Sequence, residues 1–345
     1  FTSWTPDGGL VFVTPRGIRR VDGDGGSGAY LELDHRYEIG TPSGRLVLRN
    51  VRVLDGTGAP IREGMDVTLN GNRIETIAPT SDIEPEDVRT VDGGGRTLIP
   101  GLIEMHTHLS LPAFGSEHGK VWLAYGITSM RTPADMPYRV LEERESIRSG
   151  RRIGPRVFFT GGTMDGDRIY YSGGLAIGDE EELAQEVQRA FDLDYDLVKT
   201  YVRLPDDFQK LVIEEAHRQG VFVTSHEIYP AIAYGVDGVE HVAGTSRRGF
   251  SPKITDLRRS YDDVVELVAG SGVFFTPTVL IYGGYSLALA QEPDLLEERR
   301  FTLLYPAWAQ ERFRQAPVAN DLTGSRAVMA PIFETVDELA ERGAR

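Results

Sequence analysis

The chain has 345 residues, of which 40% are hydrophobic and 26% charged, as is typical of a globular protein with two or three domains. Its net charge of −15, from 37 Lys and Arg against 52 Asp and Glu, disfavours a nucleic-acid or anionic-membrane partner, and no apolar stretch is long enough to span a membrane. The absence of cysteine excludes disulfides, zinc–thiolate sites and thiol catalysis but leaves the compartment open, as does a chain that begins at Phe1 without Met.

Residues 1–42 are predicted to contain only β structure. A Pro6-Asp7-Gly8 turn precedes the strand 10–13, and the Gly-rich run 23–28 is predicted to be a loop. The segment 3–8, Ser-Trp-Thr-Pro-Asp-Gly, resembles the repeat of TolB-type β-propellers. We therefore expect a propeller-blade remnant, with a stray hairpin packed on the next domain as the alternative. One blade cannot bury a core alone.

Residues 43–97 are predicted to form a second β unit. The stretch 45–54 alternates in the strand period, and 66–69 is expected to pair with 73–77 across Asn70-Gly71-Asn72, a short run of hairpin-turn residues. We interpret this unit as a small β-sandwich segment.

Residues 98–345 show repeated strand–helix units. This pattern predicts the α/β class, namely a TIM-like (β/α)8 barrel with parallel strands inside and helices outside. The stretch 161–178, with Asp165 and Asp167, is predicted to be a rim or lid loop. Strands are predicted at 98–105, 126–131, 156–160, 197–202, 221–225, 238–241 and 273–277, and helices at 180–192, 205–219, 229–234 and 326–342.

Two histidines end the first of these strands. His106 and His108 stand two positions apart, and because side chains alternate along a strand, both imidazoles should point into the barrel mouth. His226 and His241 end the fifth and sixth strands, at the carboxyl ends where barrel active sites are built. Four of the seven histidines in the chain therefore end strands. This pattern predicts a metal site, whereas a single such histidine would more often be structural.

Lys199 lies on the predicted strand 197–202 and should face the same mouth. A buried ammonium is costly unless its pKa falls or it is paired. A neutral amine in such a place can capture carbon dioxide as a carbamate, whose two oxygens can bridge two metal ions. The simpler alternative is a strand-end lysine that pairs with a carboxylate.

Several motifs in order over residues 44–345 resemble the amidohydrolase superfamily, in its imidazolonepropionase/prolidase-like branch. The run Pro100–His108 is similar to the family's Pro-Gly-Leu-Ile-Asp-x-His-x-His, with Glu104 in place of Asp. The other matching runs are 123–131, 154–156, 198–199, 216–220, 235–241 and 276–278.

This resemblance implies a role for each matched position. His106 and His108 would bind the more buried of two divalent metal ions, with zinc as the expected element, and His226 and His241 the more exposed one. Lys199, N6-carboxylated, would bridge them. His217 would be a helix residue and no ligand.

The resemblance also implies what this sequence lacks. The family's catalytic Asp stands in a Gly-Thr-Asp motif on the eighth barrel strand, which would follow Arg345, and further sandwich strands would follow as well. The fragment is therefore expected to be inactive or unfolded alone. The family arrangement with a TolB-like propeller suggests a periplasmic or secreted location. The expected partner is a small molecule, and a homo-oligomer stays open.

The predicted reaction is hydrolysis of an amide or peptide C–N bond in a dipeptide, an N-acyl amino acid or a cyclic amide, by a metal-activated hydroxide. Tyr201 is predicted to stabilise the oxyanion, with rim packing as its alternative. Arg203 is predicted to attract a substrate carboxylate, although an exposed Arg is the commoner finding.

Three other functions stay open. A mononuclear deaminase would keep the paired histidines without a bridging lysine, but that class has a Glu three positions after the fifth-strand histidine, where this chain has Tyr229. A lactonase or phosphotriesterase would use the same hydroxide on esters. A non-catalytic binding module would use the propeller remnant as its interaction surface.

Overall fold

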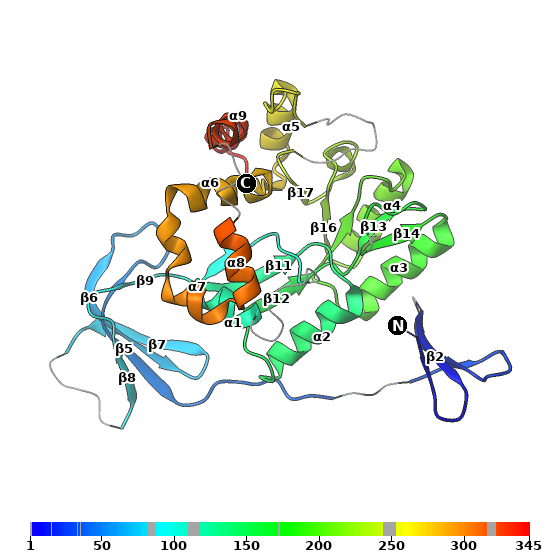
Figure 1. Ribbon diagram of the computed structural model, residues 1–345, viewed down its shortest axis with the longest axis horizontal. Coiled ribbons are helices and arrows are strands. Elements are labelled where there is room, and N and C mark those ends of the chain that lie inside the picture. Colours follow the sequence, from blue (N-terminus) through cyan, green and yellow to red (C-terminus); the bar gives the residue numbers. More distant parts are fainter. Residues whose placement is uncertain are drawn as a thin grey trace.

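The computed structural model describes residues 2–14, 16–32, 34, 36–81, 87–109, 118–171, 173–243, 253–315 and 322–345. Figure 1 shows three parts in chain order: a small antiparallel sheet near the N-terminus, a second β sheet on the opposite side of the molecule, and between them parallel strands with helices around them. Among the described helices, none is long and apolar enough to cross a membrane.

The N-terminal sheet is a four-stranded meander in the order β1-β2-β3-β4. Trp4 on its first strand is 71% exposed, and no residue of this sheet belongs to a buried hydrophobic cluster of the described chain. A four-stranded meander has the form of one propeller blade, but the propeller remnant itself stays a prediction. Its strands are β1 (Thr2–Trp4), β2 (Leu10–Thr14), β3 (Gly17–Val21) and β4 (Ala29–Tyr30).

The second sheet has the order β7-β6-β5-β8, with β9 pairing β5. The predicted hairpin is confirmed, since Asn70 pairs with Arg73 across the turn. The sheet buries one face around Val51, Met65 and Val67. Within the described residues, this unit has a single sheet, so the sandwich remains a prediction. Its strands are β5 (Arg45–Val53), β6 (Arg62–Asn70), β7 (Arg73–Pro79), β8 (Arg89–Asp92) and β9 (Thr97–Leu98).

The remaining strands form two parallel sheets, β10-β11-β12 and β14-β13-β15-β16-β17-β18. The Asp196 N–H donates to the Phe159 carbonyl (3.1 Å) and thus connects them. The fold is therefore a mixed α/β fold with parallel sheets, while closure into a barrel remains a prediction. The strands are β10 (Leu102–Glu104), β11 (Ile127–Thr132), β12 (Arg156–Phe159), β13 (Thr163–Gly166), β14 (Gly174–Ile177), β15 (Leu197–Thr200), β16 (Phe222–Ser225), β17 (Gly238–Glu240) and β18 (Phe274–Thr276).

Helices connect these strands and extend beyond them. Helix α3 begins where Asp179 accepts a hydrogen bond from the Glu182 N–H (2.9 Å), with three Glu residues in the first turn. The segment 284–315, for which no element was predicted, is largely helical. The helices are α1 (His118–Ala124), α2 (Pro137–Arg148), α3 (Glu180–Asp192), α4 (Asp206–Arg218), α5 (Asp262–Ser271), α6 (Gly284–Gln291), α7 (Arg299–Leu304), α8 (Ala307–Gln315) and α9 (Leu322–Glu341), with short 3-10 turns η2 (Ala231–Tyr234), η3 (Val279–Tyr282) and η4 (Pro293–Leu296).

Two predicted elements were wrong. The strand expected at 98–105 is divided into β9 and β10, which belong to different sheets. Pro100 lies between them, and a proline has no N–H to donate to a ladder. The loop expected at 161–178 contains β13 and β14, and its buried Asp165 accepts hydrogen bonds from the N–H groups of Arg203 and Tyr170, both at 2.8 Å.

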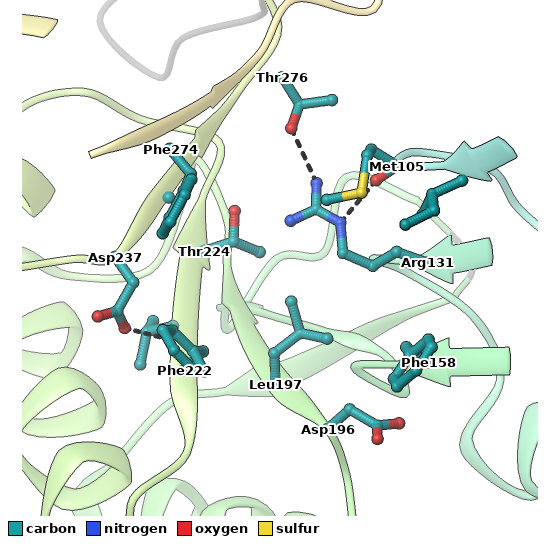
Figure 2. A pocket seen from close by; sticks show the side chains of 13 residues that line it. Met105, Arg131, Phe158, Asp196, Leu197, Phe222, Thr224, Asp237, Phe274 and Thr276 are labelled. Carbon is teal, nitrogen blue, oxygen red and sulfur yellow. Dashed lines mark hydrogen bonds between the residues drawn. The ribbon is translucent and has the colours of Figure 1, made fainter. Parts of the chain in front are cut away.

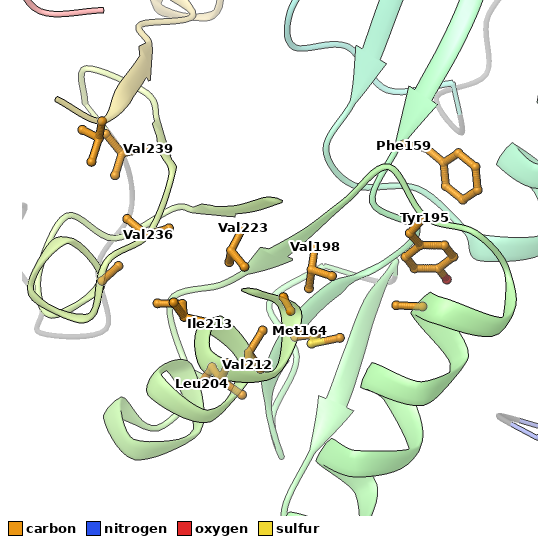
Figure 3. Packing of buried hydrophobic residues seen from close by; sticks show 14 of the residues in the cluster. Phe159, Met164, Tyr195, Val198, Leu204, Val212, Ile213, Val223, Val236 and Val239 are labelled. Atoms are coloured by element: carbon orange, nitrogen blue, oxygen red, sulfur yellow. The ribbon is translucent and has the colours of Figure 1, made fainter. Parts of the chain in front are cut away.

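Apolar side chains of the parallel strands and of the covering helices form the main core. Figure 3 shows Phe159 beside Tyr195, with Val198 and Val223 facing helix residues such as Ile213. The ring centroids of Phe159 and Tyr195 are 5.0 Å apart, and the Arg144 guanidinium carbon lies 4.5 Å from the Phe159 ring centroid. This core anchors the strands whose carboxyl ends carry the polar residues described below.

Phe159 and Phe158 provide a matched test of this core. Phe159 is 0% exposed and Phe158 is 39% exposed. We expect Phe159→Ala to lower the free energy of unfolding by about 3–5 kcal/mol, because it leaves a cavity, and Phe158→Ala to lower it by much less. Denaturant titration of both variants measures the difference. Equal losses would show that the two rings are packed alike.

Candidate functional site

Four histidine rings lie together at the carboxyl edge of the parallel strands. The ring centroid of His106 is 5.3 Å from that of His108 and 4.6 Å from that of His241. His241 lies 4.7 Å from His226, whose ring is 4.6 Å from that of Tyr201. The structure therefore brings together the four histidines predicted as metal ligands.

The end of β17 supplies two adjacent side chains to this cluster. Along an extended strand, Glu240 and His241 would point to opposite faces. His241 instead has a φ of 66°, in the left-handed region that few non-glycine residues occupy. Both side chains therefore reach His106, and the strand expected to extend to residue 241 ends at Glu240.

The proton positions on two rings follow from their partners. His106 Nδ1 lies 2.7 Å from Glu240 Oε2, and His108 Nδ1 lies 2.7 Å from the Ala134 carbonyl oxygen. A carboxylate and a carbonyl only accept, so Nδ1 carries the proton and Nε2 of each neutral ring keeps its lone pair. The Nε2 of His106 is buried and has no hydrogen-bond partner within the described ranges.

His241 shows a related arrangement, with Nδ1 2.6 Å from the Thr278 hydroxyl oxygen. Histidines that bind metals generally hold their second ring nitrogen in such a hydrogen bond. Burial lowers the pKa of His106 to about 4, and burial also lowers the pKa of His108, His226 and His241. The rings are therefore neutral at pH 7, as metal ligands must be.

Lys199 and Tyr201 stand on and directly after β15, beside the histidines. Both side chains are buried, and Lys199 Nζ lies 5.9 Å from the Tyr201 ring centroid. Burial lowers the pKa of Lys199 to about 8, although the charge of Glu240 opposes this change. A substantial fraction of the amine is thus neutral near pH 8, as carbamate formation requires.

Arg203, predicted to attract a substrate carboxylate, holds the connection between β13 and β14. Its Nη1 donates to the carbonyls of Arg168 (2.9 Å) and Ile169 (2.8 Å), and its guanidinium carbon lies 5.2 Å from the Tyr170 ring centroid. The rings of Tyr170 and Tyr171 lie 6.1 and 5.7 Å from that of Tyr201. Arg203 thus orders this aromatic rim, and its role toward a substrate stays a prediction.

Four supporting residues were missed from the sequence, namely Glu240, Arg131, Thr224 and Lys253. Glu240 is 0% exposed and accepts hydrogen bonds from Arg131 Nη2 and from Thr224 Oγ1, both at 2.6 Å. Lys253 is buried and donates to the carbonyls of His226 (2.5 Å) and Glu240 (2.6 Å), so it joins the ends of β16 and β17. The sequence marks neither Glu240 nor Lys253, because alternation along a strand places Glu240 on the face opposite to His241 and nothing around Lys253 singles it out.

The donor atoms at this site are of the type that divalent metal ions bind. Within the described ranges, no three His, Asp or Glu side chains alone form a group that could hold an ion. The neutral rings, the buried Nε2 of His106 and the adjacent Lys199 nevertheless provide nitrogen donors of the type that zinc prefers. Metal binding is therefore a proposal drawn from the donor atoms.

A pocket of about 360 Å³ is lined in part by Arg131 and Thr224, two of the residues that donate to Glu240. Figure 2 shows that apolar side chains such as Phe158, Leu197, Phe222 and Phe274 line most of it. Arg131 lines the pocket and reaches Glu240, but none of the four histidines lines it, nor does Lys199. The pocket is therefore separate from the donor atoms, and we do not assign it to the substrate.

No protein-family model matches the chain. It is similar to an N-acyl-D-glutamate deacylase of Alcaligenes xylosoxydans xylosoxydans, with 41% identity over 86 residues, which are 25% of this chain and 17% of that protein. It is also similar to a 5'-deoxyadenosine deaminase of Methanothermobacter thermautotrophicus, with 41% identity over 70 residues, 20% of this chain and 15% of that protein. The chain thus matches less than a fifth of the length of either relative. The solved structure of a Xaa-Pro dipeptidase with bound methionine in the active site has a similar fold, with a TM-score of 0.60 and 18% identity over 87% of this chain and 78% of that one.

Proposed function

We propose that this protein is a metal-dependent hydrolase of the amidohydrolase superfamily that cleaves an amide or peptide C–N bond in a small molecule. One observation carries the proposal: four neutral imidazoles and Lys199 gather at the carboxyl edge of parallel strands, with the Nδ1 of three rings held in hydrogen bonds. The names of the relatives, a deacylase of an N-acyl amino acid, a deaminase and a dipeptidase, support C–N bond cleavage.

In this proposal His106 and His108 would hold one divalent ion, His226 and His241 would hold a second, and N6-carboxylated Lys199 would supply carbamate oxygens as further ligands. Bound ions of this kind supply a water of lowered pKa and a Lewis acid for the substrate carbonyl. Zinc is the expected metal, because nitrogen-rich sites of neutral imidazoles suit it.

The other residues position the substrate and the ligands. Tyr201, buried against His226, is proposed to donate a hydrogen bond from its hydroxyl to the developing oxyanion. Glu240 already accepts from His106, Arg131 and Thr224, so it is not the group that takes the proton from the attacking water. The family resemblance assigns that step to an Asp in a Gly-Thr-Asp motif, and we propose no residue of this chain for it.

The pH dependence of metal uptake tests the role of Lys199. Its pKa is lowered to about 8, so the neutral amine increases as the pH rises through 8. At equal dissolved carbon dioxide, we expect apoprotein to take up zinc faster at pH 8.5 than at pH 6.5, in both cases at pH values where the histidines are largely neutral. Stopped-flow uptake with a zinc indicator measures this. Rates independent of carbon dioxide would contradict carboxylation.

A metal count combined with a substrate screen, both on the full-length protein because this chain alone is expected to be inactive, tests the proposed function. We expect two zinc ions per chain by elemental analysis, and faster turnover of dipeptides and N-acyl amino acids than of lactones or phosphotriesters. Faster turnover of esters would instead assign a lactonase or phosphotriesterase. A protein that binds no metal would reject the proposal and favour a binding module.

A mononuclear deaminase is the second candidate, because one curated relative carries that name. Two residues weigh against it. Tyr229 stands where that class has a Glu, and Lys199 lies beside the four rings, where a mononuclear site needs no bridge. One tightly held ion per chain, with release of ammonia from an aminopurine, would support the deaminase.

A further inference from the structure

We propose that Glu240 is a positioning residue that fixes the protonation state of the His106 ring, so that Nε2 is the atom available to a metal ion. This inference rests on the proposed function. It concerns the ligand geometry of the protein, and it assigns Glu240 no contact with the substrate.

The first support is the burial of Glu240 among three donors. Its carboxylate is 0% exposed and receives hydrogen bonds from His106 Nδ1 (2.7 Å), Arg131 Nη2 (2.6 Å) and Thr224 Oγ1 (2.6 Å). These donors come from the segment after β10, from β11 and from β16, whereas Glu240 ends β17. One carboxylate therefore connects four neighbouring parts of the parallel sheets.

The second support is that Arg131 fixes both partners of this contact. Besides Glu240, the guanidinium donates to the Met105 carbonyl (2.6 Å) and to Thr276 Oγ1 (3.1 Å). Met105 directly precedes His106 in the chain. Arg131 therefore holds the carboxylate and the backbone that carries the imidazole in one arrangement, so that the ring can rotate little.

The third support is the chemistry of the acceptor. A carboxylate paired with Arg131 is ionised and can only accept, so the proton of His106 must stay on Nδ1. The lone pair then lies on Nε2 of the same ring, and this atom is buried and has no hydrogen-bond partner in the described part of the chain. If Glu240 only stabilised the fold, its carboxylate would not need to hold the proton on Nδ1 and leave the buried Nε2 of His106 with its lone pair.

The variant Glu240→Gln separates positioning from stability. Glutamine keeps the size of the side chain, but its amide N–H₂ would face a donor, either His106 or Arg131. Where the amide faces His106, the ring can regain this hydrogen bond only by moving its proton to Nε2, which removes the ligand lone pair. Where it faces Arg131, the guanidinium no longer fixes the side chain beside His106. The control is Glu186→Gln, because Glu186 is also a buried carboxylate paired with an arginine, Arg189, and lies on α3 away from the histidines.

Zinc alone is the probe, titrated into apoprotein against a chromophoric chelator. We expect E240Q to weaken zinc binding at the site that contains His106 by roughly 10- to 100-fold, the usual effect of losing a residue that orients a metal ligand. We expect E186Q to bind zinc as the unmodified protein does. E240Q binding as tightly as E186Q would overturn the inference. If the unmodified protein binds no zinc, the proposed function fails instead.

A second measurement needs no folded E240Q. In ¹⁵N-histidine spectra of the unmodified apoprotein, the His106 signals are assigned by their loss in His106→Gln. We expect a protonated Nδ1 and an unprotonated Nε2. A proton on Nε2 of His106 would overturn the inference even if every Glu240 variant failed to fold.

Discussion

In the full-length protein, replacing Lys199 by Met is expected to reduce turnover by more than about 100-fold, the largest effect usually seen for a residue that merely orients a ligand. Met keeps the apolar stem in its buried place but offers no amine to carbon dioxide, so the shared ligand between the two ions is lost. With ¹³C-bicarbonate, the unmodified protein should show a carbamate carbon signal that is absent from K199M.

Lys253 provides a matched control for this prediction. It is also buried, and burial lowers its pKa to about 8 as well, but it donates to the carbonyls of His226 and Glu240. We expect Lys253→Met to keep the carbamate signal, although the protein loses stability. A carbamate signal that survives in K199M and disappears in K253M would place the carbamate on Lys253 and contradict the proposal.

His106→Gln is expected to have the second large effect, with loss of one zinc ion and more than about 100-fold of kcat/KM, because a ligand itself is removed. Glutamine cannot supply the imidazole nitrogen that the Glu240 contact presents. Elemental analysis and steady-state kinetics with the best substrate of the screen measure both changes.

His217→Gln is the control for His106. His217 lies on the surface of α4, where its Nε2 is 2.9 Å from Asp237 Oδ2. Because partly exposed ion pairs contribute little, we expect His217→Gln to keep two zinc ions and nearly full turnover. Equal losses of zinc and of kcat/KM in the two variants would show that replacing any histidine disturbs the protein, and would contradict a ligand role for His106.

The parallel strands could be predicted from the sequence because their signal is local. The runs around β15, β16 and β17 are short, apolar and bounded by turn residues, as buried parallel strands usually are. The segment of β13 and β14 carries no such signal, since the Gly-rich run 161–174 lacks alternation and has only two β-branched residues, Thr163 and Ile169. There the pairing depends on distant partners, such as Thr200 opposite Met164.

The candidate site was predictable to the extent that it depends on strand ends. His226, His241 and Lys199 could be placed because parallel strands bring their carboxyl ends to one edge. Glu240 could not, because the alternation rule puts it on the face opposite to His241. Only the left-handed backbone at His241 brings both inside, and the local sequence does not predict this conformation, since few non-glycine residues adopt it.

The left-handed turn at His241 has a mechanical consequence. A single peptide unit joins Glu240, which holds the ring of His106, to His241, whose ring contacts the same imidazole from another side. A substrate that displaced the tip of β17 would move the side chains of Glu240 and His241 together, because no flexible segment separates them.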